Sequence, residues 1–373
     1  MNPLDEESRR IHGGNRWVWM RERGFAMDDV IDFSADVNPL GFPDCVRSVI
    51  EANVESIRHY PDPDAVALRE AIAEFHSIPM ECVLPANGSA ELITLLVQFR
   101  FFQRGVVFGP TFTEYAWVAR QRQATVIDVL AKEDAGFQFP GISLHKTPKP
   151  EVVFLCNPNN PTGQLISKTR VLELAQWCEK IGAYLVLDEA FIDFVEPSDG
   201  ISLVSEAARF DSVVVLRSLT KSFAIPGLRL GYLVGSETIV QRLRALQTPW
   251  PLNTFALLVG TRLLQENDWL SHTRQQIAHL RQRLCQSLET IPDLKVFPSV
   301  TNFLLCKLRS LDRSASELTC DLAQQGLLIR CCDDFVGLET GRFIRIAVRT
   351  QKENERLVQV LRNIMEGRIA NSR

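Results

Sequence analysis

The chain has 373 residues, of which 46% are hydrophobic and 23% charged, as in ordinary globular proteins. Its formal net charge of −4 gives no overall attraction to nucleic acid or to anionic lipid, so neither is expected as a partner. The acidic start MNPLDEESRR does not resemble a secretory signal, and no apolar run approaches the ~20 residues of a membrane helix.

The nine cysteines are scattered along the chain, and none belongs to a C-x-x-C pair. This spacing favours neither a zinc site nor a disulfide framework. We therefore expect a cytoplasmic protein with reduced thiols and no bound metal.

Short runs of valine, isoleucine and leucine alternate with amphipathic stretches from residue 105 onward, after a helical stretch at 15–26. The predicted buried strands are 105–108, 124–130, 152–155, 183–187 and 213–216. Helical spacing is found at 113–123 and at 167–181. Strands that alternate with helices predict an α/β fold with a mostly parallel sheet covered on both faces.

After about residue 250 the pattern changes to one long helical stretch at 255–288, followed by mixed elements. The predicted strands are 294–297, 301–308, 327–331 and 343–348, and the predicted helices are 314–325 and 352–366. This order is typical of a separate α+β domain. The predicted division is an amino-terminal segment that joins the small domain (1–40), a large domain (41–255) and a small carboxy-terminal domain (256–373).

Two polar stretches lie where predicted elements begin or end. N-G-S-A-E at 87–91 opens an apolar helix, and its Gly-Ser turn would present free N–H groups to a phosphate. A simple helix cap at Ser89 explains this stretch equally well. N-P-N-N-P-T-G at 157–163 follows a predicted strand, and its two Asn-Pro steps predict either a plain loop or a rigid turn that fixes Asn160.

Two further stretches place charges at strand ends. Asp188 directly follows the run 184–187, and a carboxylate leaving a buried strand needs a structural arginine or a ligand cation. Lys221 and Arg229 follow the run 213–216. Most lysines are simply exposed, but a desolvated lysine can form a Schiff base and an arginine can hold a phosphate.

These residues together match the groups of one cofactor. A helix start, a fixed amide, a buried carboxylate, a lysine and an arginine all fall at strand ends of one predicted sheet. Pyridoxal 5′-phosphate has a phosphate, a phenolic oxygen, a ring nitrogen kept protonated and an aldehyde that bonds to lysine. The residues therefore predict a pyridoxal-phosphate enzyme.

Three stretches resemble motifs of the fold-type-I pyridoxal-phosphate enzymes, in the class I/II aminotransferase group. They are N-P-T-G at 160–163, D-E-A-F at 188–191 and S-L-T-K…G-L-R at 218–229, in the family's order. The resemblance covers nearly the whole chain. It implies the fold-type-I transferase fold, with a mostly parallel seven-stranded sheet in the large domain and a smaller α+β domain.

Within this group the chain resembles most the L-threonine-O-3-phosphate decarboxylases of cobalamin biosynthesis, which are relatives of the histidinol-phosphate aminotransferases. The stretches that indicate this are H-G-G-N at 12–15, D-F-S-A-D-V-N-P-L-G at 32–41 and I-R-I-A-V-R-T at 344–350. The resemblance implies a lyase acting on L-threonine O-3-phosphate or on a similar phosphorylated amino acid such as phosphoserine.

Two other functions are open at this point. One is an aminotransferase acting on histidinol phosphate or a related amino acid. The other is a cofactor-sensing regulator without turnover, which is disfavoured because the ~40 residues before the large domain are too few for a DNA-binding module.

The resemblance also implies a cofactor role for each matching residue. Lys221 would bind the aldehyde, Asp188 would pair with the ring nitrogen, and Asn160 would hydrogen-bond the phenolic oxygen. Tyr115 would stack on the ring. The cofactor phosphate would be held by Gly88, Ser89, Ala90, Ser218 and Arg229. Tyr60 would reach the phosphate of the neighbouring subunit, which implies a homodimer with shared active sites.

The substrate-binding residues implied by the resemblance are His12, Gly13, Asp36, Asn160, Arg330 and Arg345. Among them, Arg345 would bind the α-carboxylate. Asp36 departs from the family, which usually has asparagine there, as does Asp334 near Arg330. Because a carboxylate beside a phosphate is repulsive, we expect Asp36→Asn to raise activity towards L-threonine O-3-phosphate.

Overall fold

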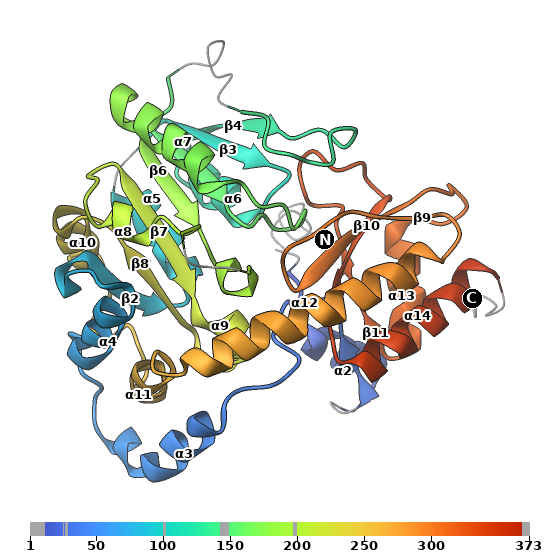
Figure 1. Ribbon diagram of the computed structural model, residues 1–373, viewed down its shortest axis with the longest axis horizontal. Helices are drawn as coiled ribbons and strands as arrows, with labels where there is room; N and C mark the ends of the chain where they lie inside the picture. The colour runs from blue at the N-terminus through green and yellow to red at the C-terminus, as the bar shows by residue number, and fades with distance from the viewer. Residues whose placement is uncertain are drawn as a thin grey trace, which may run out of the picture.

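The computed structural model describes residues 12–24, 26, 29–99, 102–141, 149–196 and 200–367. A large sheet with helices on both faces lies beside a smaller α+β part (Figure 1). This confirms the predicted α/β fold with a mostly parallel seven-stranded sheet. The predicted boundaries at residues 40 and 255 stay a prediction. Within the described ranges, no helix combines the length and apolar character that crossing a bilayer requires.

The large sheet has the strand order β2-β8-β7-β6-β5-β3-β4. Its strands are β2 (Val83–Asn87), β3 (Arg104–Gly109), β4 (Thr125–Leu130), β5 (Val152–Cys156), β6 (Tyr184–Asp188), β7 (Val213–Ser218) and β8 (Leu230–Val234). Neighbours from β7 to β4 pair in parallel, whereas β8 is antiparallel to both β7 and β2. The carboxyl ends of β3, β5, β6 and β7 therefore lie along one edge.

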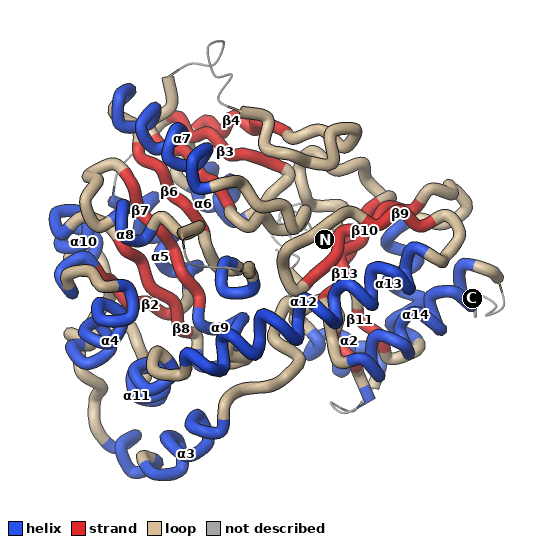
Figure 2. Tube along the Cα trace, viewed as in Figure 1, coloured by secondary structure: helices blue, strands red, loops and turns tan. Residues whose placement is uncertain are grey.

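Successive side chains of these strands enter two different cores, one on each face. Val153 and Leu155 of β5 belong to one core, and Phe154 between them belongs to the other. The first core is covered by α4 (Val66–His76), α7 (Lys168–Ile181), α8 (Val204–Ala207) and α11 (Thr254–Leu263). The second is covered by α5 (Ser89–Phe99), α6 (Glu114–Gln121) and α10 (Glu237–Arg244). Figure 2 shows these helices around the strands. Burial on both faces explains why the strands are continuously apolar.

The smaller part is built on an antiparallel sheet of order β12-β13-β10-β9. Its elements are α12 (Asn267–Glu289), β9 (Leu294–Val296), β10 (Phe303–Leu308), α13 (Ala315–Gln324), β12 (Arg330–Cys331), β13 (Phe343–Ala347) and α14 (Gln351–Met365). A separate parallel pair joins β1 (Ile31–Asp32) to β11 (Leu327–Leu328). The beginning of the chain is thereby bound to its last quarter.

The remaining elements are short. They are α2 (Arg16–Arg23), α3 (Asp44–Ala52) and α9 (Leu219–Ser222), with 3-10 turns at Val54–Arg58, Met80–Cys82, Ile192–Phe194 and Pro226–Leu228. The predicted helix at 15–26 is α2, which ends where Gly24 adopts a left-handed conformation, with φ of 73°.

Two predicted elements are divided in the structure. The predicted helix 255–288 is two helices, because α11 ends at Leu263 and α12 begins at Asn267. No glycine or proline lies between them, so the sequence has no break signal. The predicted strand 327–331 is also wrong as one strand, since β11 and β12 belong to different sheets.

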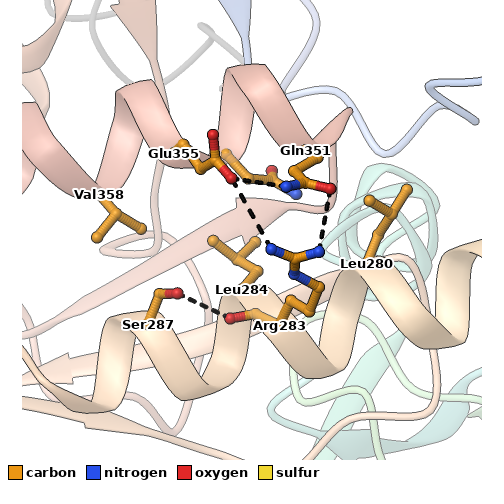
Figure 3. A pocket seen from close by; sticks show the side chains of 8 residues that line it. Leu280, Arg283, Leu284, Ser287, Gln351, Glu355 and Val358 are labelled. Carbon is orange, nitrogen blue, oxygen red and sulfur yellow. Dashed lines mark hydrogen bonds and ion pairs between the residues drawn. The ribbon is translucent and has the colours of Figure 1, made fainter.

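Helix α12 packs against α14 on the outer side of the smaller part. Leu280, Leu284 and Leu288 of α12 are buried there. Arg283 lies in a small pocket beside them, donates to Gln351 Oε1 at 3.1 Å and lies 3.9 Å from Glu355 (Figure 3). These contacts tie the two helices together, and the cation of this pocket is already paired.

Candidate active site

One cavity of about 800 Å³ lies between the carboxyl ends of the large-sheet strands and the smaller sheet. Every predicted site residue except Tyr60 lines it. These lining residues are His12, Gly13, Asp36, Gly88, Ser89, Ala90, Tyr115, Asn160, Asp188, Ser218, Lys221, Arg229, Arg330 and Arg345. Among the described residues, no group of three or more histidine, cysteine, aspartate or glutamate side chains is placed to hold a metal.

Lys221 is on α9, the single turn that directly follows β7. Its side chain is half-buried, and the Lys221 carbonyl accepts a hydrogen bond of 3.0 Å from the Asn38 N–H. Burial lowers the pKa of Lys221; nearby Asp36 opposes this effect and Arg345 reinforces it. A lysine with a lowered pKa has more of the neutral amine that attacks a carbonyl.

Asp188 is the last residue of β6 and is buried. Its carboxylate accepts hydrogen bonds from the Tyr115 hydroxyl at 2.6 Å and from the Ala190 N–H at 2.9 Å. Burial raises the pKa of Asp188, and the two donors and Lys221 act against this effect. A buried carboxylate held only by neutral donors at bonding distance fits a cationic ring nitrogen.

The turn from β2 into α5 has the geometry of a phosphate seat. Gly88 adopts a φ of +79°, and a Cβ there would lie 2.6 Å from Nη2 of Arg229. Ser89 begins an eleven-residue helix, so its first N–H groups have no partner within the helix. The Ser218 hydroxyl lies nearby in the same cavity, 2.8 Å from the Thr220 hydroxyl. The start of α5, the Arg229 guanidinium and the Ser218 and Thr220 hydroxyls therefore converge at one place, where an anion would bind.

Asn160 is held from both the large and the small sheet. The turn before it is fixed by Asn157, which donates to the Ile166 carbonyl at 3.1 Å and accepts from its N–H at 2.8 Å. The Asn160 Oδ1 atom accepts from Nη1 of Arg345 at 2.5 Å. This bond leaves the amide N–H₂ of Asn160 available to a phenolic oxygen.

The two predicted substrate arginines lie side by side on neighbouring strands of the smaller sheet, since Arg330 of β12 pairs with Arg345 of β13. Each has its own counter-ion. Arg345 lies 2.7 Å from the Asp36 carboxylate, and Arg330 contacts both oxygens of Asp334, at 2.7 and 2.6 Å. Asp36 is therefore paired with a cation, a relationship that its sequence position does not reveal.

The backbone at Gly13 lies so close to the segment that follows β1 that only glycine fits there. A Cβ on Gly13 would lie 1.8 Å from the Ser34 carbonyl oxygen, and the Gly14 N–H donates to the Ser34 hydroxyl at 2.9 Å. The same carbonyl accepts from Nη2 of Arg345 at 2.9 Å. Next to it, His12 lies 2.9 Å from the Glu114 carboxylate. The start of the described chain is thus fixed against the cavity.

Sequence reasoning missed several residues of the cavity wall. They are Arg16, Trp17, Asp32, Ser34, Glu114, Phe335 and Arg349. Glu114 directly precedes the predicted site residue Tyr115, and Ser34 lies two residues before Asp36 in the stretch quoted at 32–41. Their partners lie far away in the sequence, which is why their roles were not predicted.

Tyr60 lies outside the cavity. It is 80% exposed and stacks on Trp250 with ring centroids 4.6 Å apart. Its role at a neighbouring subunit stays a prediction. Tyr115 lines the cavity, but Phe154 covers one face of its ring at 5.4 Å, so stacking on the cofactor also stays a prediction.

The comparison with known families shows to which family this chain belongs. The family described as "Aminotransferase class I and II" matches residues 28–361. The chain belongs to this family. Aminotransferase class I and II enzymes of this kind depend on pyridoxal 5′-phosphate, and the buried carboxylate, the lysine and the phosphate seat fit that cofactor.

Individual members of the family are similar over nearly the full chain. A threonine-phosphate decarboxylase of Salmonella typhimurium is 37% identical, covering 95% of this chain and 97% of that protein. An adenosylcobalamin biosynthesis bifunctional protein of Leptospira interrogans is 30% identical, covering 95% of this chain and 41% of that protein. The crystal structure of the histidinol-phosphate aminotransferase from Clostridium acetobutylicum has a TM-score of 0.83 at 27% identity, covering 90% of this chain and 99% of that one.

Proposed function

We propose that this family member decarboxylates L-threonine O-3-phosphate, or a similar phosphorylated amino acid such as phosphoserine, to the amino-alcohol phosphate in cobalamin biosynthesis. The observation that carries the proposal is one cavity with Lys221 and Asp188 on one side and Arg330 and Arg345 on the other. The 37% identity to a relative named threonine-phosphate decarboxylase supports this substrate. The protein acts in the cytoplasm on a small molecule.

The cofactor would be held by residues of the large sheet. Lys221 would bind its aldehyde, Asp188 its ring nitrogen and Asn160 its phenolic oxygen. Its phosphate would be held by Gly88, Ser89, Ala90, Ser218 and Arg229. When bound, pyridoxal 5′-phosphate supplies an electron sink for cleavage of a bond at the substrate's α-carbon.

Residues of the smaller sheet and of the chain start would orient the substrate. Arg345 would hold the α-carboxylate, and Arg330, His12 and Gly13 would hold the distal phosphate. The orientation in which these residues hold the substrate would decide which of its α-carbon bonds is cleaved. Lys221 has a lowered pKa, so its amine can hold and move the proton at the α-carbon.

The second candidate is an aminotransferase acting on histidinol phosphate or a related amino acid. The similarity of this chain to a histidinol-phosphate aminotransferase structure, with a TM-score of 0.83, supports this second candidate. The two activities cleave different bonds at the α-carbon, and the aminotransferase also transfers the amino group to a keto acid. Lys221 and Asp188 would hold the cofactor in the same way in both.

A panel of phosphorylated amino acids, with carbon dioxide detection and with or without a keto-acid acceptor, tests the proposal. We expect carbon dioxide and a primary amine from L-threonine O-3-phosphate or phosphoserine, with no need for the acceptor. Consumption of the keto acid without carbon dioxide release would establish the aminotransferase instead.

We further propose a homodimer in which Tyr60 completes the site of the partner. Large exposed apolar side chains gather in two nearby segments that include the Tyr60–Trp250 stack, a composition that suits an interface. They are Phe42, Val54, Ile57, Tyr60, Val66, Leu246 and Trp250.

Mixing two inactive variants tests the shared site. Tyr60→Ala and Lys221→Ala are each expected to have little activity as homodimers. After exchange of subunits, one site of each mixed dimer has both residues intact, so about a quarter of wild-type activity should return. Mixed dimers that stay inactive would show that Tyr60 does not act across subunits.

A further inference from the structure

A buried ion pair occupies the substrate side of the cavity. Asp36 and Arg345 are 5% and 4% exposed, and Oδ2 of Asp36 lies 2.7 Å from Nη1 of Arg345. The other oxygen of Asp36, Oδ1, is buried and has no hydrogen-bond partner among the residues that the structure describes. This carboxylate is therefore held on one side only.

Arg345 has few donors left for a ligand. A guanidinium has five N–H groups. Nη1 donates to Asn160 and lies 2.7 Å from the Asp36 carboxylate, and Nη2 donates to the Ser34 carbonyl. Within the described part of the chain, the Nε atom of Arg345 has no hydrogen-bond partner. A carboxylate that binds Arg345 would therefore share one cation with Asp36, and two like charges at one site favour protonation of one of them.

The charged groups around Asp36 come from four elements. Arg345 of β13, Lys221 of α9 and Arg330 of β12 favour the ionised form, and Asp32 of β1 opposes it. Burial is the largest influence and raises the pKa of Asp36. An arriving carboxylate adds a further negative charge to this set and removes part of the stabilisation that Arg345 provides to Asp36. Oδ1 of Asp36 is buried without a hydrogen-bond partner among the described residues, so a proton can reside on it.

We propose that a carboxylate enters the Arg345 site together with one proton, which Asp36 takes up from solvent. The step balances, because the Asp36 carboxylate becomes a carboxylic acid and no other bond changes. When the substrate carboxylate leaves as neutral carbon dioxide, the electron pair of the broken bond stays with the α-carbon, which takes up a proton. The Arg345 site then holds no ligand carboxylate, so Asp36 releases its own proton and ionises again beside Arg345. The inference rests on the proposed function only in taking Arg345 as the seat of the carboxylate.

The consequence is a selectivity that depends on pH. Carboxylate ligands should bind more weakly as the pH rises, by up to about tenfold per pH unit while Asp36 is ionised in the free enzyme. Ligands without a carboxylate should not share this dependence. An asparagine at position 36 cannot ionise, so it would remove the coupling.

Binding of 3-phosphoglycerate to the holoenzyme, measured by calorimetry, tests the proposal. This probe has a carboxylate and a phosphate but no amine, so it cannot react with the cofactor. Titrations in buffers of different ionisation enthalpy give the number of protons taken up. Glycerol 3-phosphate, which lacks the carboxylate, is the matched ligand, and Asp36→Asn is the matched variant because its shape is nearly the same.

We expect the wild type to take up more protons than Asp36→Asn with 3-phosphoglycerate, and equal numbers with glycerol 3-phosphate. Asp334→Asn changes the counter-ion of Arg330 rather than that of Arg345, so it should retain the wild-type proton uptake. Equal uptake by the wild type and Asp36→Asn would overturn the proposal. So would failure of 3-phosphoglycerate to bind the wild type, or its loss in Asp36→Asn while glycerol 3-phosphate still binds.

The outcome is independent of turnover. Proton uptake that depends on Asp36, together with no carbon dioxide release from any phosphorylated amino acid, would reject the decarboxylase and leave the inference intact. Carbon dioxide release without such uptake would do the reverse.

Discussion

The Tyr115 hydroxyl donates a 2.6 Å hydrogen bond to Oδ2 of Asp188, and both residues are buried. Tyr115 is in the first turn of α6, whereas Asp188 ends β6. Phe154 packs on the Tyr115 ring at an interplanar angle of 12°. The tyrosine is fixed by this packing, and it fixes the carboxylate in turn.

Tyr115→Phe should therefore lower kcat while the cofactor stays bound. The substitution keeps the ring and removes one donor to the carboxylate, a bond worth about 1.5–3 kcal/mol, or roughly 10- to 100-fold in rate. Steady-state kinetics and a pH titration of the cofactor absorbance measure this effect. Tyr184→Phe, at the other end of β6, is the control and should keep wild-type kcat. An unchanged rate and spectrum in Tyr115→Phe would refute the role.

Lys221 should be the residue that carries the cofactor. The purified protein should be yellow, and borohydride should bleach it while leaving a pyridoxyl group on Lys221, because reduction makes the imine permanent. Peptide mapping locates the label. A label on any other lysine would move the site, and Lys221→Arg should remain unlabelled.

Gly88→Ala should weaken binding of pyridoxal 5′-phosphate by about tenfold or more, because its Cβ would displace the Arg229 guanidinium from the phosphate seat. The matched control is Gly182→Ala, where φ is +68° and no atom lies within 4 Å of the new Cβ. Both variants carry a left-handed alanine at a cost of roughly 1–2 kcal/mol. Equal losses of cofactor affinity in the two variants would contradict the assignment.

His76 should make the folded state sensitive to acid. Burial and then the charge of Arg217 lower the pKa of His76 to about 3, from 6.5, and its ring lies 2.7 Å from the Tyr232 hydroxyl. Between these pH values the unfolded chain binds more protons. The contribution of His76 is therefore complete above about pH 6.5 and is lost as the pH falls, by at most about 1.4 kcal/mol per pH unit.

Urea unfolding of the wild type and of His76→Gln at several pH values from 5 to 8 measures this contribution. The free energy of unfolding of the wild type should fall more steeply below pH 6.5 than that of the variant. His279→Gln, which changes an exposed histidine, should follow the wild type. Parallel curves for all three proteins would exclude His76 as the source.

The strands of the large sheet were predictable where they are continuously apolar. β2 and β8 were not predicted. β2 contains Pro85 and β8 contains Gly231, and both residue types argue against a strand. The structure explains both exceptions. β2 is an edge strand, and a Cβ at position 231 would lie 2.8 Å from the Ser89 backbone nitrogen.

The cofactor side of the site was predictable because parallel strands end at one edge, so Asn160, Asp188 and Lys221 had to lie near each other. The substrate side of the site was less predictable from the sequence. The pairs Asp36–Arg345 and His12–Glu114 join segments far apart in the sequence, and no local pattern specifies them. Asp36 could be recognised as unusual, but its cation could not be named.

The pairing of β1 with β11 has a consequence for how the protein is made. Arg345, which binds both Ser34 and Asp36, is translated 311 residues after Ser34. A nascent chain can assemble the large sheet on the ribosome, but it cannot complete the substrate side of the cavity until Arg345 has been translated. Any stop codon upstream of position 345 therefore yields a product with an open, incomplete cavity.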